Sequence, residues 1–204
     1  KSRNYRIQHI PISRDKRPGI RIRPEYITIH STANPNSSGQ NERDWLVNPI
    51  NNRVASWHLV VDEQGVLEAI PLAEMAYHSG TREGNEKSIS VEICESGNRK
   101  ESLDKAARLV ANLLDERKWG IDRLKRHFDW SGKNCPRIFN YNDWEGWDLF
   151  KERVEAFLGS KASPWAKESW QWAIENKISH GQRPRDWATR EEVIAMIYRA
   201  RGVK

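Results

Sequence analysis

Two histidines and one cysteine have the side chains of a catalytic zinc site. His30 ends an alternating segment, His127 lies in a second short apolar segment, and Cys135 follows eight residues later, after a glycine-bearing loop. Zinc binds imidazole nitrogen and thiolate sulfur, and a catalytic zinc site keeps one position open for water. Because the chain holds six histidines, the spacing by itself indicates this trio only weakly.

Two further residues, Glu92 and Lys133, have side chains that could take part in hydrolysis. Glu92 lies between Val91 and Ile93, where an unpaired carboxylate is costly to bury. Beside a metal-bound water, Glu92 could act as a general base. An equal alternative is that Glu92 is a partly exposed strand residue that pairs with an Arg or Lys and has no catalytic role. Lys133 lies two residues before Cys135 and could stabilise an oxyanion, although a solvated loop lysine is the more common case.

The segments around these residues predict β-strands. Residues 26–30 (YITIH) and 88–93 (SISVEI) alternate between apolar and polar side chains, which is typical of strands. The alternation places Glu92 on the polar face of its strand. Residues 62–65 (DEQG) separate two apolar runs and predict a hairpin, and residues 124–128 predict a further short strand that carries the second histidine.

Helices are predicted between and after the strands. Residues 42–48 predict a short helix that stops at Pro49, residues 102–119 carry apolar side chains at helical spacing, and residues 143–158 predict a second amphipathic helix. Residues 1–25 predict an extended arm with at most one short element. Strands and helices that follow one another in this way indicate an α/β fold.

The chain is expected to divide into two parts. Residues 1–158 form the larger domain, residues 159–163 (GSKAS) a linker, and residues 164–204 a small helical domain of helix, loop and helix. Thr189 and Glu192 predict a capping box before the last helix. The small part holds too few residues for a large core, so we expect it to pack on a neighbour.

The composition favours an ordered protein without a membrane span. Of the 204 residues, 37% are apolar and 30% are charged, and ten are tryptophan. No run approaches 18 uncharged apolar residues, and no basic-then-apolar leader opens the chain. A chain without a leader is expected to wait in the host bacterial cytoplasm until it is released, unless its true start is missing.

Positive charge gathers at the two ends of the chain, whose net charge is +6. Residues 1–26 hold eight Lys or Arg against two Asp or Glu, and residues 159–204 hold nine against five. Such ends would attract a nucleic acid or an anionic cell-wall surface through the same long-range field, and a solvated surface is the plain alternative. No nucleic-acid motif accompanies the charge, so a nucleic-acid partner is not expected.

Five segments that occur in one order carry a family resemblance: YITIHSTAN, ASWHLVVDEQG, AYHSG, SISVEIC and RHFDWSGKNCP. Together they are similar to the zinc amidase family of N-acetylmuramoyl-L-alanine amidases, which phage endolysins and peptidoglycan-recognition proteins share. The resemblance covers about residues 7–158. It implies a central mixed β-sheet flanked by helices, one zinc ion as cofactor, and bacterial peptidoglycan as the partner.

The resemblance also assigns the catalytic residues. It places the zinc ligands on His30, His127 and Cys135. It places the catalytic carboxylate on Glu92 and the oxyanion-stabilising lysine on Lys133. A cysteine as the third ligand is similar to the phage-type branch of the family, whereas other branches have aspartate there.

Substrate contacts fall on Trp57 and His78 by the same resemblance. Trp57 departs from the family pattern, because many relatives have tyrosine there and tryptophan offers no hydroxyl. A structural role with satisfied hydrogen bonds is the alternative for His78 and also for His58. Cys94 is expected to pack in the core, and a disulfide with Cys135 is the weaker alternative.

The implied function is that of an endolysin that cleaves the amide bond between N-acetylmuramic acid and the L-alanine of the stem peptide. Glu92 would take a proton from the attacking water and return it to the leaving nitrogen. The alternative is a non-catalytic peptidoglycan-recognition module that keeps the groove. Such modules generally lack the third ligand, so Cys135 favours the enzyme. The oligomeric state is left open.

The last part of the chain, residues 172–202, resembles one S-layer homology repeat, which has a similar Thr-Arg-Glu helix after a loop with glycine and proline. Such repeats bind secondary cell-wall polymers, usually in sets of three, which makes a wall polymer a possible second partner. Four tryptophans of this part could stack on sugars or form the core of a two-helix piece: Trp165, Trp170, Trp172 and Trp187.

Overall fold

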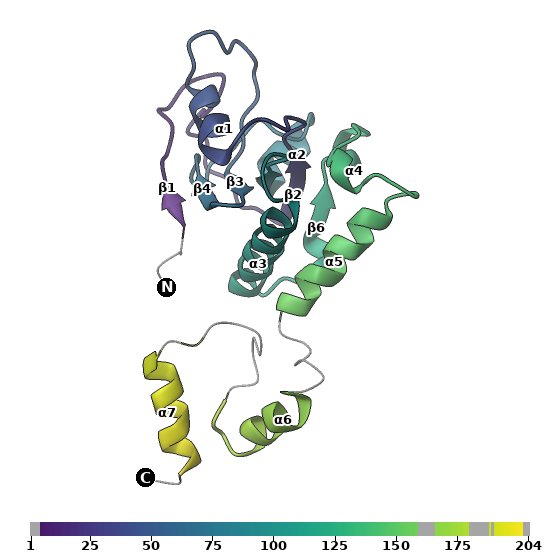
Figure 1. Cartoon of the computed structure of the whole chain (residues 1–204). Helices are drawn as coiled ribbons and strands as arrows, with labels where there is room; N and C mark the ends of the chain where they lie inside the picture. Colours follow the sequence, from purple (N-terminus) through teal and green to yellow (C-terminus); the bar gives the residue numbers. More distant parts are fainter. Residues whose placement is uncertain (1–4, 159–165, 180–187, 189, 202–204) are drawn as a thin grey trace.

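The computed structural model describes residues 5–158, 166–179, 188 and 190–201. Residues 5–158 build a six-stranded sheet from β1 (Arg6–Ile7), β2 (Tyr26–Ser31), β3 (Leu59–Asp62), β4 (Gly65–Glu68), β5 (Ser88–Ile93) and β6 (Leu124–Arg126) (Figure 1). The strand order is β1-β4-β3-β5-β2-β6. Strands β3 and β4 pair antiparallel, as the predicted hairpin requires, and the other pairs are parallel. The predicted mixed sheet is therefore confirmed.

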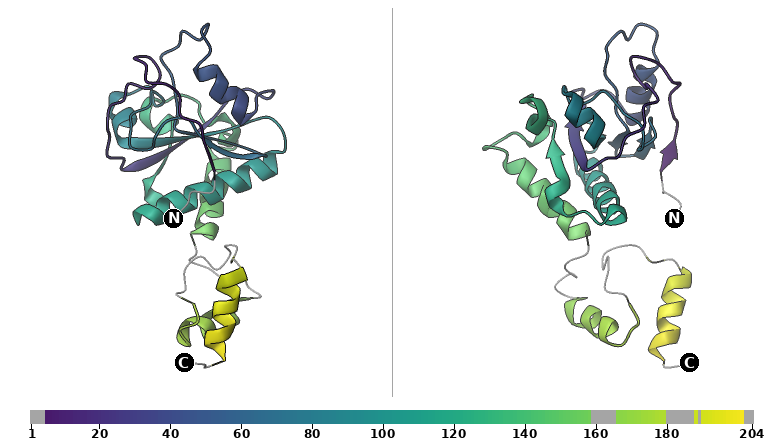
Figure 2. Two further views of the ribbon diagram at one scale, coloured as in Figure 1. Left: turned by 90° about the vertical axis from the view of Figure 1, so that its left-hand side faces the viewer. Right: turned by 180° about the vertical axis from the view of Figure 1, so that it is seen from behind.

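Helices cover both faces of this sheet. Helices α3 (Arg99–Arg117) and α5 (Glu145–Phe157) pack together on one face, whereas α1 (Gly39–Leu46) lies on the opposite face (Figure 2). The shorter elements are α2 (Arg82–Lys87), α4 (Phe128–Ser131) and two 3-10 turns, η1 (Ile121–Arg123) and η2 (Arg137–Phe139). Helix α2 was not predicted from the sequence.

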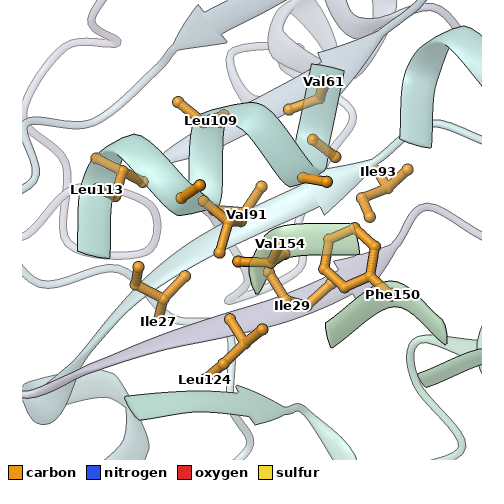
Figure 3. Close-up of a cluster of buried hydrophobic side chains, with 14 of the residues drawn as sticks. Ile27, Ile29, Val61, Val91, Ile93, Leu109, Leu113, Leu124, Phe150 and Val154 are labelled. Carbon is orange, nitrogen blue, oxygen red and sulfur yellow. The ribbon is translucent and has the colours of Figure 1, made fainter. Parts of the chain in front are cut away.

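The alternation along β2 and β5 separates an apolar face from a polar one. The apolar side chains join residues of α3 and α5 in the main core (Figure 3): Ile27, Ile29, Ile89, Val91 and Ile93. Full burial of each such side chain stabilises the fold by about 1.5–3 kcal/mol. Because successive strand residues point to opposite faces, His30 and Glu92 lie on the other side of the sheet.

Capping side chains move two helix starts from their predicted positions. Helix α1 begins at Gly39, because the Ser38 side chain accepts a hydrogen bond from the Asn41 N–H. Helix α3 begins at Arg99, because Asn98 accepts one from the Glu101 N–H. These side chains satisfy amide groups that have no partner within the helix. Both helices therefore start three residues before their predicted first residues, 42 and 102.

His127 follows its strand instead of lying within it. Strand β6 ends at Arg126, and His127 has helical dihedral angles, φ −55° and ψ −36°, at the start of α4. The N–H of His127 still bonds to the Ile29 carbonyl at 3.2 Å. The Asp129 carboxylate accepts from the Arg126 N–H at 2.7 Å and closes the turn that ends the strand. The spacing of apolar residues over 124–128 predicts a strand there but does not reveal this hydrogen bond between Arg126 and Asp129, which ends the strand.

The N-terminal arm is extended, as expected, and is tied to the domain. Strand β1 adds to one edge of the sheet, and isolated bridges join Ser13 to Arg17 and Arg21 to Glu74. The Arg17 guanidinium also bonds to both carboxylate oxygens of Glu74, at 2.7 and 2.9 Å. This two-point ion pair holds the arm against the segment that follows β4.

The described tail residues form helices α6 (Lys167–Glu175) and α7 (Arg190–Ala200). The Arg199 guanidinium donates to the Ile178 carbonyl at 3.1 Å, which links the second helix to the end of the first. Trp172 is 51% exposed, whereas Trp170 is only partly exposed. One of the tail tryptophans is thus open to a ligand.

Several predictions about the tail lie outside the described residues. These are the linker 159–163, the capping Thr189, and Trp165 and Trp187. Within the part of the chain that the structure describes, no helix combines the length and the apolar character that crossing a membrane requires.

Candidate metal centre

The parallel strands bring three residues that could do chemistry to the end of the sheet where these strands finish. His30 stands near the carboxyl end of β2, Glu92 near that of β5, and His127 directly after β6. Strand β2 lies between β5 and β6, and His30 is the register partner of Glu92. In open α/β sheets, ligands bind outside the carboxyl ends of the strands. The carboxyl ends of these strands are therefore the expected place for a functional site.

His30, His127 and Cys135 form a buried cluster whose ligand atoms lie within 4.8 Å of one another. The Nδ1 atom of His30 lies 3.7 Å from the Sγ atom of Cys135. The Nδ1 atom of His127 is buried and has no hydrogen-bond partner among the described residues. A buried polar atom without a partner is costly unless something binds it. The two imidazoles and the thiol of this cluster are side chains that bind zinc, so the cluster fits a zinc ion.

Burial keeps the two imidazoles neutral, which is the form that binds metal. Burial and, to a smaller extent, the charge of Lys133 together lower the pKa of His127 to about 4. Burial also lowers the pKa of His30 well below its usual value. The thiol of Cys135 has its pKa raised to about 12 by burial and by the nearby charge of Glu92. A bound cation would reverse this last effect, since a coordinating thiol loses its proton.

The loop that carries Cys135 is tied to the sheet by an ion pair. The Arg137 guanidinium donates to both carboxylate oxygens of Glu95, with a shortest distance of 2.6 Å. Glu95 lies just beyond the end of β5, and it also accepts from the Ala33 N–H at 2.9 Å. The Cys135 carbonyl accepts from the Phe128 N–H at 3.0 Å, which links the loop to α4. The thiol position is thus held from two sides.

Glu92 has the surroundings of a general base. Its side chain is 16% exposed, and its Oε1 atom lies 3.8 Å from the Nδ1 atom of His30. Its Oε2 atom is buried without a hydrogen-bond partner among the described residues. Burial, with a contribution from the carboxylate of Glu42, raises the pKa of Glu92 to about 8. The group can therefore exchange a proton near neutral pH.

A cleft of about 320 Å³ opens over these residues. Lys133 lines the cleft with an exposed side chain, and its positive charge opposes the rise in the pKa of Glu92. The cleft is further lined by a mixture of polar and aromatic residues: Glu42, Trp45, Asn51, Arg53, Tyr77, Asn134 and Arg137. The five residues expected to carry the chemistry all line this one cleft.

The two residues expected to contact substrate, Trp57 and His78, line the cleft but are largely buried. Trp57 is 6% exposed and belongs to an apolar cluster with Leu46 and Ile70. His78 is 8% exposed, and its Nδ1 atom lies 3.1 Å from the Nε2 atom of His30. Little of either side chain is therefore open to a ligand.

His58 has the structural role that the sequence left open. Its Nε2 atom donates to the Glu74 carbonyl at 2.7 Å, and its Nδ1 atom accepts from the Ser90 N–H at 3.0 Å. Burial lowers its pKa to about 4. Cys94 is fully buried in the same apolar cluster as Trp57, and both cysteines are free thiols, so no disulfide forms.

Sequence reasoning missed the polar residues that support the site. The Glu95–Arg137 ion pair joins residues 42 positions apart, and the Trp130 indole donates to the Thr28 hydroxyl over 102 positions. Patterns among consecutive residues cannot reveal contacts of this length. No signal in the sequence pointed to these four side chains.

Comparison with known proteins gives consistent results. Residues 21–138 match the family model of N-acetylmuramoyl-L-alanine amidases. The chain is 45% identical over 148 residues to the N-acetylmuramoyl-L-alanine amidase XlyB of Bacillus subtilis (strain 168), covering 68% of this chain and 44% of that protein. It is 45% identical over 131 residues to the amidase CwlA of the same strain, covering 60% and 47%. The chain thus spans about half the length of these curated relatives.

Two solved structures match the fold over nearly their whole length. The catalytic domain of XlyA has a TM-score of 0.66 at 33% identity, covering 74% of this chain and 99% of that domain. PlyL has a TM-score of 0.65 at 30% identity, covering 74% and 97%. The Staphylococcus aureus hydrolase AmiA, at 22% identity and a TM-score of 0.58, shares the fold.

Proposed function

Because the chain belongs to the N-acetylmuramoyl-L-alanine amidase family, we propose that residues 1–158 are a zinc-dependent peptidoglycan hydrolase. The bond cleaved is the amide between N-acetylmuramic acid and the L-alanine of the stem peptide. One observation carries the proposal: the ligand atoms of His30, His127 and Cys135 lie within 4.8 Å of one another beside the half-buried carboxylate of Glu92, at an open cleft. The two curated relatives bear the name of this activity.

His30, His127 and Cys135 would hold the metal. When bound, zinc supplies a Lewis acid that polarises the scissile carbonyl and lowers the pKa of water toward ~7. Three protein ligands are the number that a catalytic zinc site uses, since such a site keeps one further position for water or substrate. Their burial excludes bulk water from the ligands and strengthens electrostatic interactions at the reacting bond.

Glu92 moves the proton in this reaction. It accepts a proton from water as the water oxygen bonds to the carbonyl carbon. The protonated carboxyl then donates to the L-alanine nitrogen as the carbon–nitrogen bond breaks, so Glu92 ends as a carboxylate. A pKa near 8 keeps both protonation states within reach near neutral pH. Trp57 has no hydroxyl to share this task.

Lys133 supplies positive charge over the carbonyl oxygen. Its exposed side chain lines the cleft, and its charge acts on His127, Glu92 and Cys135. A cation aimed at the oxygen stabilises the negative charge that develops there in the transition state. Trp57 and His78 line the wall of the same cleft, with little of either side chain exposed.

Mass spectrometry of digested peptidoglycan tests this proposal. Purified wall is incubated with the zinc-loaded protein and, as a control, with protein held in excess chelator. New amino termini on L-alanine with intact glycan strands, lost on chelation, are expected. Cut glycan strands or cut cross-bridges would contradict the proposed bond. Binding of wall without cleavage, with zinc present, would favour a recognition module.

The tail is proposed to hold the wall through a secondary polymer, in the manner of an S-layer homology repeat. The exposed Trp172 side chain on α6 supports this proposal, because aromatic faces stack on sugars. Trp172→Ala in the full chain should weaken adsorption to intact walls while cleavage of soluble fragments stays unchanged. Deletion of residues 159–204 should have the larger effect. Unchanged adsorption in both variants would contradict the proposal.

A further inference from the structure

Behind His30 lies a chain of hydrogen bonds that no step of the proposed hydrolysis uses. The Nε2 atom of His30 lies 3.1 Å from Nδ1 of His78, and Nε2 of His78 lies 3.4 Å from the Ser88 hydroxyl oxygen. That hydroxyl also bonds to the Gly84 carbonyl at 2.7 Å and to the Thr28 hydroxyl at 2.8 Å. The four side chains are buried, so water does not compete for these bonds.

Both ends of this chain have fixed hydrogen-bond roles. A carbonyl can only accept, so the Ser88 hydroxyl donates its one hydrogen to Gly84. An indole can only donate, and Trp130 donates to the Thr28 oxygen at 2.8 Å. The hydrogen of Thr28 is then directed to Ser88. Toward His78, the Ser88 oxygen can therefore only accept.

The positions of the imidazole hydrogens follow from these roles. A neutral imidazole carries hydrogen on one nitrogen and a lone pair on the other. Because Ser88 accepts, His78 carries its hydrogen on Nε2, and its Nδ1 atom is an acceptor. His30 must then donate from Nε2, which leaves the lone pair on its Nδ1 atom. That atom faces the Sγ atom of Cys135 at 3.7 Å.

We propose that His78 is a positioning residue that, together with Ser88, holds His30 in the tautomer and ring orientation needed to bind zinc through Nδ1. The inference rests on the proposed zinc site and deepens it. It gives His78 a role that acts through His30 instead of through contact with substrate. Hydrogen-bond partners behind a metal ligand typically change metal affinity by about 10–100-fold when they are lost.

Zinc affinity in the full chain tests the role of His78. The dissociation constant is measured by chelator competition for the wild type, His78→Phe and His78→Asn. Phenylalanine fills the space but accepts no hydrogen bond, so binding should weaken by about 10–100-fold. Asparagine can place its amide oxygen close to the position of Nδ1, so it should recover most of the affinity. Ser88→Ala, which removes the hydroxyl that accepts from His78, should cause a smaller loss.

A second measurement reads the tautomer directly and needs no metal. Imidazole nitrogen shifts of histidine-labelled, zinc-free protein distinguish hydrogen on Nε2 from hydrogen on Nδ1. His30 should carry hydrogen on Nε2 in the wild type and should populate both tautomers in His78→Phe. This readout would not move if His78 only filled space.

His58→Phe is the matched control. His58 is also buried, with its ring centroid 6.0 Å from that of His78, but its ring nitrogens form hydrogen bonds with Glu74 and Ser90. This variant should lose stability while its zinc affinity stays at the wild-type value. If both variants lost a comparable amount of zinc affinity, the effect of replacing His78 would be a general loss of structure, and the inference would be overturned.

The outcomes separate the inference from the proposed function. Wild-type zinc affinity in His78→Phe, or a His30 hydrogen on Nδ1 in the wild type, overturns the role of His78 alone. If the wild type binds no zinc, the proposed function fails, and the inference that rests on it fails too, whatever the tautomer shows. If His78→Phe does not fold, Ser88→Ala decides: unchanged zinc affinity together with an unchanged His30 tautomer would overturn the inference.

Discussion

His30 and Glu92 are register partners across the parallel strands β2 and β5, with the Nδ1 atom of the histidine 3.8 Å from an oxygen of the carboxylate. Both residues lie on the polar side of the sheet, away from the main core. The sheet itself therefore places the proposed base beside a proposed ligand. Sites built on strands hold such distances more accurately than sites built on loops.

Replacing Glu92 with glutamine should abolish most of the cleavage. Glutamine keeps the size of the side chain but cannot accept a proton, and loss of a general base costs about 10²–10⁴-fold in rate. The rate is followed as new L-alanine amino termini, with zinc content measured on the same sample. Glu42→Gln, a second carboxylate at the cleft, should retain most of the activity. Full activity in Glu92→Gln would remove Glu92 from the mechanism.

Zinc should stabilise the protein through Cys135 and not through Cys94. A ligand that binds only the folded state at 100 times its dissociation constant contributes about 2.7 kcal/mol. The rise in Tm on adding zinc should disappear in Cys135→Ala and persist in Cys94→Ala. Both thiols are buried, so both variants lose packing and only the response to zinc distinguishes them. Equal responses in the two variants would contradict the ligand assignment.

Stability should fall between pH 7.5 and pH 5 in part because of His58. Burial lowers its pKa to about 4 in the folded protein, while an unfolded histidine titrates near 6.5. The unfolded chain therefore takes up the proton first, so this stability is complete above 6.5 and is lost as the pH falls toward 4.

From the pKa difference of His58, the loss by pH 5 amounts to about 2 kcal/mol. Urea unfolding of the wild type and His58→Phe at both pH values measures it. The variant should start less stable and lose less on acidification. If both proteins lose the same free energy of unfolding, His58 is not the group responsible.

Removing the Arg137 side chain should loosen the loop that carries Cys135. Arg137→Ala leaves the nearly buried Glu95 carboxylate without its charged partner, and a buried acceptor that loses its partner destabilises the fold around it. Zinc affinity should fall along with the free energy of unfolding. Arg82→Ala breaks an exposed ion pair with Glu86 and should change neither quantity measurably. Unchanged zinc affinity in Arg137→Ala would show that the ion pair with Glu95 is not needed to position Cys135.

The strands, their faces and the family could be derived from the sequence alone. Alternation predicted two strands with an apolar and a polar face and placed Glu92 on the polar face, and the structure agrees, with Ile27 and Ile29 of the apolar face in the core. The ordered motifs identified the amidase family, which the family model matches over residues 21–138. The division at residues 159–163 stays a prediction. These successes share one cause: periodicity and motifs are properties of residues close in the chain.

The roles of the histidines were decided only by the tertiary structure. His58 and His78 each lie in a short motif with no local feature that separates a structural histidine from one behind a metal ligand. The partner of His78 is His30, 48 positions away, and the partner of His58 is Ser90, 32 positions away. Which nitrogen meets which group depends on the pairing of β2, β5 and β3. That pairing is set by the packing of the whole core, and no short segment of sequence contains it.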